Sequence, residues 1–321
     1  MAISTVVRSG LSTFDKFQRT SAGFSGTRRI IVSGASTRLY SDDGGATWTA
    51  TTQSSFSSSG NNYPVTKNGA IYVLGVSNNA WQFSYDGLTW YPSTGFPGDA
   101  NASPYFFDQL ANGEVAICSY YAFTRHHLLR EIMGFNGNIG SSGVPFDVAG
   151  TGIANDGVIG PSSVWVWTFT GTTIAYSTNN GLQWFTFNTG VVPIGVIWGR
   201  DKFLIPTNGS TTYLTATSAA PTTWTTRTFP TTPQTRSAVR FVNGLWLLGG
   251  TSGALFTSPD GITWTSRTSG AGANTIFGFG FAGGVYVAVG AGGYIGTSPD
   301  GITWTARTSG ITTTLQTVGG I

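Results

Sequence analysis

The sequence TSPDGITWTSRTSG at residues 257–270 returns as TSPDGITWTARTSG at residues 297–310, forty residues further along the chain. Looser copies of the Ser-x-Asp-Gly-x-Thr-Trp pattern begin at Ser41, Ser84 and Ser177, and a copy without Asp and Gly spans Ser218 to Trp224. The tryptophans that end these copies lie at positions 48, 90, 184, 224, 264 and 304, with intervals of 42, 94, 40, 40 and 40 residues. The interval of 94 residues covers two periods, so the chain divides into seven units.

A second pattern repeats in step with the first. Ile30, Tyr72, Trp246 and Tyr286 each begin or lie in an apolar, β-branched or aromatic run, and each precedes its tryptophan by 18 residues. The runs at residues 164–167 and 203–205 take this place in units four and five, and the run at 115–117 takes it in the third unit, which lacks the tryptophan pattern. Each unit therefore reads as four short strands joined by turns, which predicts an all-β, seven-bladed β-propeller of four-stranded antiparallel blades.

The expected organisation is one domain over residues 1–321, with the blades set by the period. Their approximate bounds are 11–52, 53–94, 95–140, 141–188, 189–228, 229–268 and 269–310. The remaining ends, 1–10 and 311–321, close the ring or contact a neighbour: residues 4–10 resemble an outermost strand and residues 312–320 an innermost one. The sequence leaves these two alternatives open.

Composition narrows the classes of function. Only 9% of the residues are charged and 40% are hydrophobic, which indicates a globular chain with a large core. The formal net charge is +3, with three lysines and no basic run, so nucleic-acid binding is not expected. We find no signal-peptide pattern at the start and no apolar span long enough to cross a membrane. The single cysteine, Cys118, lies in an apolar run and is expected to be a buried thiol.

The repeated pattern resembles the Asp-box of the sialidase-like (BNR) repeat propellers. In such a turn the Asp accepts backbone amides and the Gly adopts a positive φ, while the Trp packs under the hairpin. The resemblance implies that the boxes are structural and lie between the two outer strands of a blade, away from the usual ligand face. The matching residues are Ser41, Asp43, Gly45, Trp48, Ser84, Asp86, Gly87, Trp90, Ser177, Asn179, Gly181, Trp184, Ser258, Asp260, Gly261, Trp264, Ser298, Asp300, Gly301 and Trp304.

A catalytic set is not evident in the sequence. Glycoside hydrolysis needs two carboxyl groups or a Tyr–Glu pair, and the chain has only two glutamates, Glu114 and Glu131. Asp99, Asp147 and Asp156 are expected in loops between blades, where a catalytic pair would have to lie. The segment Arg28-Arg29-Ile30 does not match the Arg-Ile-Pro motif of sialidases. We therefore predict no catalytic residues, no metal site and no cofactor, and lean towards a protein that is not an enzyme.

A binding surface is expected where the repeats are irregular, in units two to four, because loops on a rigid scaffold usually carry function. The segment between residues 91 and 106 is rich in Gly, Pro and Asn, and residues 125–131 form a charged stretch compatible with a helix. The candidate binding residues are Asn78, Tyr105, Arg125, His126 and His127. Arg227, Arg267 and Arg307 form a predicted row on the outer strands, interpreted either as charges that protect an edge or as a surface for an acidic partner.

The low charge, the Gly, Ser and Thr content and the near-identical last units resemble virion-associated propellers of tailed bacteriophages. This resemblance favours a structural or adhesion protein of the virion, such as a tail-fibre, spike or capsid-decorating module, made in the host cytoplasm. Its expected partners are other virion proteins and a bacterial surface glycan, and oligomers within the virion are compatible with the sequence. Two alternatives stay open: a glycan-cleaving depolymerase that uses loop carboxylates, and a bacterial assembly or scaffolding propeller.

Overall fold

The computed structural model describes sixteen segments of the chain. They are residues 29–34, 37–51, 66–68, 71–75, 81–84, 86–89, 91–92, 103–109, 115–121, 125–131, 142–146, 154–161, 164–169, 171–179, 183–234 and 238–320. The regular structure in these residues is β-strand, apart from the 3-10 turn η2 (Ala291–Gly293) and a 3-10 residue at Ala238. The fold is all-β and of the propeller type, as the repeat predicts.

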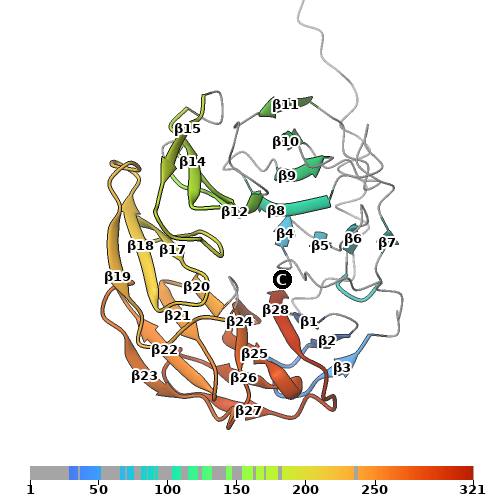
Figure 1. Ribbon diagram of the computed structural model, residues 1–321. Coiled ribbons are helices and arrows are strands. Elements are labelled where there is room, and N and C mark those ends of the chain that lie inside the picture. The colour runs from blue at the N-terminus through green and yellow to red at the C-terminus, as the bar shows by residue number, and fades with distance from the viewer. Residues whose placement is uncertain are drawn as a thin grey trace, which may run out of the picture.

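The described strands pair into four-stranded antiparallel sheets (Figure 1). Five of them have described side chains: β28 (Leu315–Gly320)-β1 (Ile30–Gly34)-β2 (Arg38–Ser41)-β3 (Thr49–Ala50); β12 (Ala154–Ile159)-β13 (Trp165–Phe169)-β14 (Thr173–Ser177)-β15 (Phe185–Asn188); β16 (Ile197–Gly199)-β17 (Lys202–Pro206)-β18 (Thr212–Thr217)-β19 (Thr225–Thr228); β20 (Val239–Val242)-β21 (Leu245–Gly249)-β22 (Ala254–Ser258)-β23 (Thr265–Thr268); and β24 (Ile276–Ala282)-β25 (Val285–Gly290)-β26 (Ile295–Ser298)-β27 (Thr305–Arg307).

Two further sets of strands are described almost entirely by their backbone pairing. They are β4 (Thr66–Asn68)-β5 (Ile71–Gly75)-β6 (Trp81–Ser84)-β7 (Tyr91–Pro92) and β11 (Ser142–Phe146)-β10 (Arg125–Glu131)-β9 (Val115–Tyr121)-β8 (Ser103–Gln109). The apolar runs predicted from the sequence supply the second strand of each set: β1, β5, β9, β13, β17, β21 and β25.

One sheet joins the two ends of the described chain. β28 pairs antiparallel with β1, with Ile30 opposite Gly320 and Val32 opposite Val318, and it occupies the innermost position. The hydroxyl oxygens of Ser33 and Thr317 lie 2.7 Å apart in the buried part of this pair. Of the two alternatives for the termini, the innermost strand at residues 312–320 is therefore present, and the predicted strand at residues 4–10 lies outside the described residues.

In the sheets whose side chains are described, burial falls from the second strand to the outer edge. All five residues of β13 are buried, whereas β15, β19 and β23 are exposed except at their third residue. Apolar side chains from neighbouring sheets pack together: Ile30 and Leu39 share one cluster with Val287 and Leu315. A strand covered on both faces needs a continuous apolar run, which explains the sequences of the second strands.

Because the strands are antiparallel, the connections between them lie at two opposite ends of each sheet. The connection from the third to the fourth strand carries the Ser-x-Asp pattern, so we call this the box end. The connection from the second to the third strand lies at the opposite end, because consecutive antiparallel strands reverse direction. One difference from the expected blade bounds concerns β11, which pairs with β10. The third set of strands therefore reaches Phe146, beyond the bound expected at residue 140.

Candidate functional site

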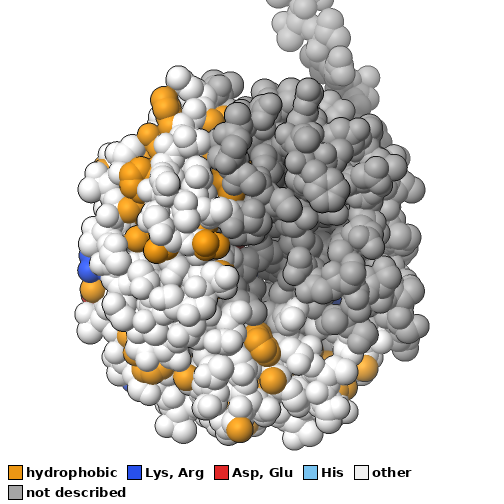
Figure 2. All heavy atoms as spheres, viewed as in Figure 1, with side chains coloured by type: hydrophobic (Ala, Val, Ile, Leu, Met, Phe, Trp, Pro, Cys, Tyr) orange, Lys and Arg blue, Asp and Glu red, His pale blue; other side chains and the backbone are white. Residues whose placement is uncertain are grey.

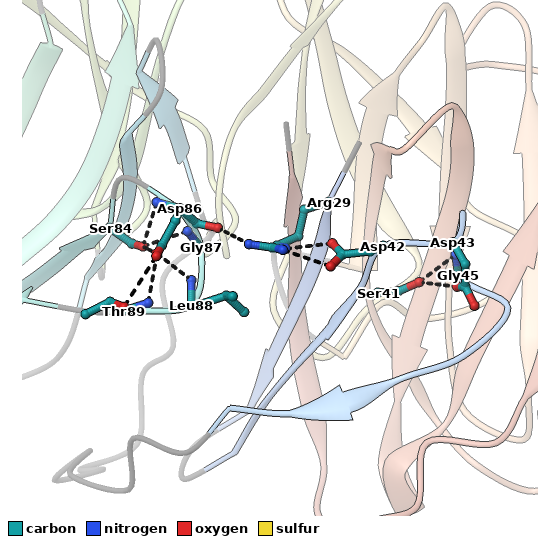
Figure 3. A network of polar contacts seen from close by, with 10 residues as sticks. All are labelled: Arg29, Ser41, Asp42, Asp43, Gly45, Ser84, Asp86, Gly87, Leu88 and Thr89. Carbon is teal, nitrogen blue, oxygen red and sulfur yellow. Dashed lines mark hydrogen bonds and ion pairs between the residues drawn. The ribbon is translucent and has the colours of Figure 1, made fainter. Parts of the chain in front are cut away.

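The Ser-x-Asp turns are the best-defined polar sites in the described residues. We call the segments Ser41–Trp48, 84–90, 177–184, Ser258–Trp264 and Ser298–Trp304 the Ser–Asp turns. Each follows the third strand of its sheet and leads into the fourth. Figure 3 shows the first two of them and the contacts between them.

The turn at Ser258 illustrates the geometry. Its hydroxyl donates to Asp260 Oδ1 at 2.8 Å and accepts the Gly261 amide at 2.8 Å. Asp260 Oδ1 in turn accepts the amides of Ile262 and Thr263, both at 2.8 Å. Gly261 has a φ of 71°, which a side chain disfavours. The carboxylate therefore satisfies the backbone donors of a tight turn whose conformation selects glycine.

The same contacts recur in the other turns. Asp300 accepts the amides of Ile302 and Thr303 at 2.8 Å, and Asp86 accepts those of Leu88 and Thr89 at 2.8 Å. In the first turn, which is one residue longer, Asp43 accepts the Thr47 amide at 3.0 Å and the Thr47 hydroxyl at 2.6 Å. Repetition in four sheets indicates a structural role for this carboxylate.

These hydrogen bonds lower the pKa of the aspartates. At Asp260, burial would raise the pKa, but the Thr263 and Ile262 amides outweigh it and hold the pKa at about 2. The Thr303 amide is the main cause of the lowered pKa of Asp300, and the Thr47 hydroxyl that of Asp43. At Asp86 the amide bonds likewise outweigh burial and lower the pKa. All four groups are therefore anionic near neutral pH, which makes them poor proton donors.

The turn at Ser177 has an amide in place of the carboxylate. Asn179 Oδ1 accepts the Gln183 amide at 2.8 Å, and the Ser177 hydroxyl lies 2.9 Å from it. The turn therefore needs an acceptor oxygen at this place and not a negative charge.

The turn tryptophans are held under the hairpins in different ways. Trp48 donates to the Gly45 carbonyl at 3.1 Å and Trp304 to the Gly301 carbonyl at 3.0 Å. Trp264 donates to the Tyr213 hydroxyl of the preceding sheet at 3.4 Å. Trp184 packs edge-on against Trp165 and Trp167.

Side chains of one sheet bind the Ser–Asp turn of the next. Arg200 donates to the Pro259 carbonyl at 2.6 Å, Lys202 to the Asp260 carbonyl at 2.9 Å, and the Tyr213 hydroxyl to the Gly261 carbonyl at 2.9 Å. Three consecutive carbonyls of this turn thus accept hydrogen bonds from the sheet before it. The aspartate orders the turn from inside, and the carbonyls on its outside are available as acceptors.

Arg29 makes the corresponding contact between the first two Ser–Asp turns (Figure 3). Its guanidinium donates to both carboxylate oxygens of Asp42, at 2.6 and 2.8 Å, and to the Asp86 carbonyl. The bond to Asp42 raises the pKa of Arg29. This bidentate pair therefore belongs to the junction between two sheets.

Of the predicted binding residues, Tyr105, Arg125, His126 and His127 lie in strands that are described by their backbone pairing alone. Asn78 lies outside the described residues. The expectation of a helix-compatible stretch at residues 125–131 was wrong: these residues form β10, paired with β9 and β11. The residue preferences are overridden because the sheet requires a third strand. Arg125, His126 and His127 therefore begin a strand at the end opposite the box end.

Tyr105 lies in β8, beside a register shift between Pro104 and Phe106, and not in a loop. Tyr120 of β9 is opposite both His126 of β10 and Ser103 of β8. The backbone therefore brings Tyr105 and His126 to the same end of one sheet. Their role in binding stays a prediction.

The expected loop position of Asp156 was also wrong. Asp156 lies in β12, beside a register shift, with 9% of its surface exposed. Its Oδ2 accepts the Val196 amide at 3.2 Å, which precedes the next innermost strand. No sequence signal predicted this contact, because it joins residues 40 positions apart. Asp99 and Asp147 lie outside the described residues, and Glu131 lies in β10.

The described residues also bear on metal binding and on membrane-spanning helices. In its described segments, no group of three or more His, Cys, Asp or Glu side chains is placed to hold a metal ion. The described residues include no helix that is long and apolar enough to cross a membrane.

Sheet order and turn geometry define this chain as a protein of the β-propeller type. Residues 192–317 match the family described as the DUF6242 beta propeller domain. Among solved structures, the chain is similar to YCF48 from Cyanidioschyzon merolae, with 15% identity, a TM-score of 0.58, and coverage of 79% of this chain and 85% of that one.

Two other solved structures have the same fold. YCF48 bound to D1 peptide has 14% identity and a TM-score of 0.54, with coverage of 77% of this chain and 84% of that one. A catalytically inactive virginiamycin B lyase from Staphylococcus aureus, solved with quinupristin, has 12% identity and a TM-score of 0.53, with coverage of 83% and 94%. No curated protein sequence matches the chain. At these identities the likeness concerns the fold alone.

Proposed function

We propose that the chain forms one closed, seven-bladed propeller whose Ser–Asp turns are Asp-boxes. The pairing of β28 with β1 supports closure, because it joins the last described strand to the first sheet. The repeated Ser, Asp and Gly contacts support the assignment of the boxes. In this arrangement the first blade takes its innermost strand from β28, and the third blade ends with β11.

We propose further that this propeller is a non-enzymatic binding scaffold, and that it serves in a bacteriophage particle as a tail-fibre, spike or capsid-decorating module. The proposal that the protein is not an enzyme rests on one observation: the described aspartate side chains are engaged in contacts within the fold. Every aspartate whose side chain is described has a contact within the fold: Asp42, Asp43, Asp86, Asp156, Asp201, Asp260 and Asp300. The contacts of Asp42, Asp43, Asp86, Asp156, Asp260 and Asp300 hold turns or strands in place, and Asp201 forms an exposed ion pair with Lys202 at 3.5 Å.

The low charge of the surface supports a role in assembly or adhesion. Figure 2 shows a face whose described part carries no Asp or Glu side chain and is mostly polar and uncharged. Such a surface suits contacts with other virion proteins or with a bacterial glycan. The candidate binding residues Tyr105, Arg125, His126 and His127 belong to this proposal, at the end of the third blade where β9 connects to β10.

Particle composition tests the proposal. Phage particles from an infected host carrying this gene are purified by density gradient, and the protein is sought by mass spectrometry and antibody labelling. We expect a fixed copy number per particle. Absence from intact, infective particles would contradict a virion role.

Enzyme activity is tested on the host polysaccharide, with the wild type compared with Asp147→Asn and Asp156→Asn. We expect no turnover by the wild type. Turnover that either substitution abolishes, with the unfolding transition unchanged, would support the depolymerase and contradict our proposal. The Asn at 156 keeps an acceptor for the Val196 amide, so folding is expected to survive.

A second candidate function is a bacterial assembly or scaffolding propeller that binds a polypeptide segment. The solved complex of YCF48 with D1 peptide favours it, since that protein shares the fold. Expression of the chain in uninfected cells, together with its absence from phage particles, would favour this candidate.

A further inference from the structure

Three arginines occupy equivalent positions on the outermost strands of consecutive sheets. Arg227 in β19 lies opposite Tyr213, Arg267 in β23 opposite Leu255, and Arg307 in β27 opposite Ile295. β19, β23 and β27 follow one another along the outside of the ring in Figure 1. We call these residues the arginine strip.

Each guanidinium is fixed by a threonine of the neighbouring strand. Nε of Arg227 donates to Thr215 Oγ1 at 3.0 Å, Nε of Arg267 to Thr257 Oγ1 at 2.8 Å, and Nε of Arg307 to Thr297 Oγ1 at 2.7 Å. The threonines are buried, with 6%, 2% and 3% of their surface exposed. A buried, β-branched partner has few rotamers, so it holds the guanidinium in one orientation.

The outer part of each guanidinium is left open. No acceptor for the terminal nitrogens of these three arginines is found among the described residues. The arginines are half-buried, and each lies opposite a buried apolar residue of the neighbouring strand. The strip thus combines an engaged Nε with two terminal nitrogens that remain available as donors, and these two nitrogens can bind a carboxylate or phosphate end-on.

The surroundings of the strip are hydroxyl groups. The exposed neighbours that carry a hydroxyl are Thr225, Thr226, Thr228, Thr265, Ser266, Thr268, Thr305 and Thr308, and Ala306 is an exposed neighbour without one. None of them is acidic, and the described carboxylates in the turns before β23 and β27, Asp260 and Asp300, are engaged within those turns. Threonine and serine hydroxyls can both donate to and accept from sugar hydroxyls.

We propose that the arginine strip binds an anionic polysaccharide, with the acidic groups of one glycan chain contacting arginines of successive blades. The inference rests on the proposed function and names its ligand class. A protecting charge on an edge strand needs no fixed orientation, whereas all three arginines have the same threonine bond. A chain of sugars also fits the hydroxyl-rich flanks better than duplex DNA, whose closely spaced phosphates call for denser positive charge.

The experiment measures binding of the full chain to polygalacturonate and to neutral dextran of similar length by isothermal titration calorimetry. We expect binding to polygalacturonate only. The triple variant Arg227→Gln/Arg267→Gln/Arg307→Gln is expected to lose about tenfold in affinity, since each solvent-exposed contact contributes modestly. The triple Lys variant keeps the net charge but lacks the planar fork, so it is expected to lose severalfold.

Two control variants distinguish specific binding by the arginine strip from a general effect of positive charge. Arg8→Gln/Lys16→Gln/Arg19→Gln removes the same number of positive charges at sequence positions outside β19, β23 and β27 and is expected to bind as the wild type does. Thr257→Val/Thr297→Val removes two of the fixing hydroxyls without changing charge and is expected to weaken binding. Thermal unfolding of every variant is measured, and only variants that unfold like the wild type are compared.

Three results would overturn the inference: no binding of polygalacturonate by the wild type, an equal loss in the Arg8/Lys16/Arg19 control, or full affinity in the triple Lys variant. Tighter binding of duplex DNA that the triple Gln variant abolishes would assign the strip to nucleic acid and would also overturn it. A failure here leaves the virion role standing, because particle composition tests that role independently.

Discussion

The turns of two neighbouring sheets occupy the same place but are built differently. In the turn Ser258–Trp264, the carboxylate of Asp260 accepts two amides, and the tryptophan nitrogen has a partner. In the turn Ser218–Trp224 the aspartate and glycine are replaced by Ala220 and Pro221. Here Thr223 donates to the Ala220 carbonyl at 3.1 Å, and the Trp224 nitrogen is buried without an acceptor in the described residues.

Both turns nevertheless connect paired strands, β22 to β23 and β18 to β19. Strand pairing and packing are therefore sufficient for the hairpin, and the aspartate adds something else. The turn with the aspartate accepts Arg200, Lys202 and the Tyr213 hydroxyl from the preceding sheet. The turn without it accepts no side-chain donor from another sheet within the described residues. We infer that the Ser–Asp turns at Ser258 and Ser84 serve to join neighbouring sheets.

The largest expected effect comes from filling a turn glycine. Gly301 has a φ of 73°, and a Cβ there would lie 2.4 Å from Leu245 Cδ2 of the preceding sheet. Gly301→Val is expected to lower the free energy of unfolding by about 3 kcal/mol, from backbone strain and overpacking together. Gly310→Val is the control, because Gly310 has the same φ but no atom within 4 Å. Urea unfolding measures both, and equal losses would contradict a role for the contact between sheets.

Removing a turn carboxylate is expected to have a smaller effect. Asp260→Ala leaves the Ile262 and Thr263 amides without their acceptor and should cost about 1 kcal/mol, as the loss of a helix N-cap does. Asp260→Asn should cost less, because Asn179 makes the corresponding bond in another turn. Asp201→Ala is the control for loss of a negative charge: its side chain is 66% exposed, and the ion pair that it forms among the described residues is with Lys202 at 3.5 Å. A control as destabilised as Asp260→Ala would show that charge, not the turn, is responsible.

The tryptophans allow the two kinds of turn to be compared directly. Trp304→Phe removes a hydrogen bond to the Gly301 carbonyl, whereas Trp224→Phe removes a nitrogen that has no acceptor in the described residues. Trp304→Phe should therefore be more destabilising by about 1 kcal/mol. Chemical denaturation of both variants provides the test, and the reverse order would refute this reading of the turns.

The smallest effect is expected from pH. The pKa of Asp260 is about 2 in the folded protein and near the ordinary 3.8 when unfolded. The lowered pKa means that its contribution to stability is complete above the unfolded value and is lost as the pH falls towards 2. The difference in stability between the wild type and Asp260→Asn should be constant from pH 7 to 5 and shrink below about pH 4. A difference that is independent of pH down to 2 would contradict the carboxylate bonds.

Much of the fold could be predicted because it depends on local repetition. The second strands follow from apolar runs such as Val285–Gly290, and the turns follow from the fixed positions of Asp and Gly. The β-strand at residues 125–131 could not be predicted from its residues, since pairing with β9 and β11 decides it.

The contacts between distant residues could not be predicted either. The pairing of Ile30 with Gly320 and the bond from Val196 to Asp156 join segments with no shared local pattern. The same holds for the donors that reach the Ser–Asp turns. Lys202 and Arg200 have no sequence motif, and only the packing of two sheets brings them to the carbonyls of the next turn.

Amide hydrogen exchange at Ile262 and Thr222 tests most directly whether the aspartate orders its turn. These residues occupy the same place in the two turns, and only the Ile262 amide has a carboxylate acceptor, at 2.8 Å. We predict slow exchange at Ile262, fast exchange at Thr222, and a rate at Ile262 close to that of Thr222 in the Asp260→Ala variant. Equal protection of the two amides in the wild type would contradict the account.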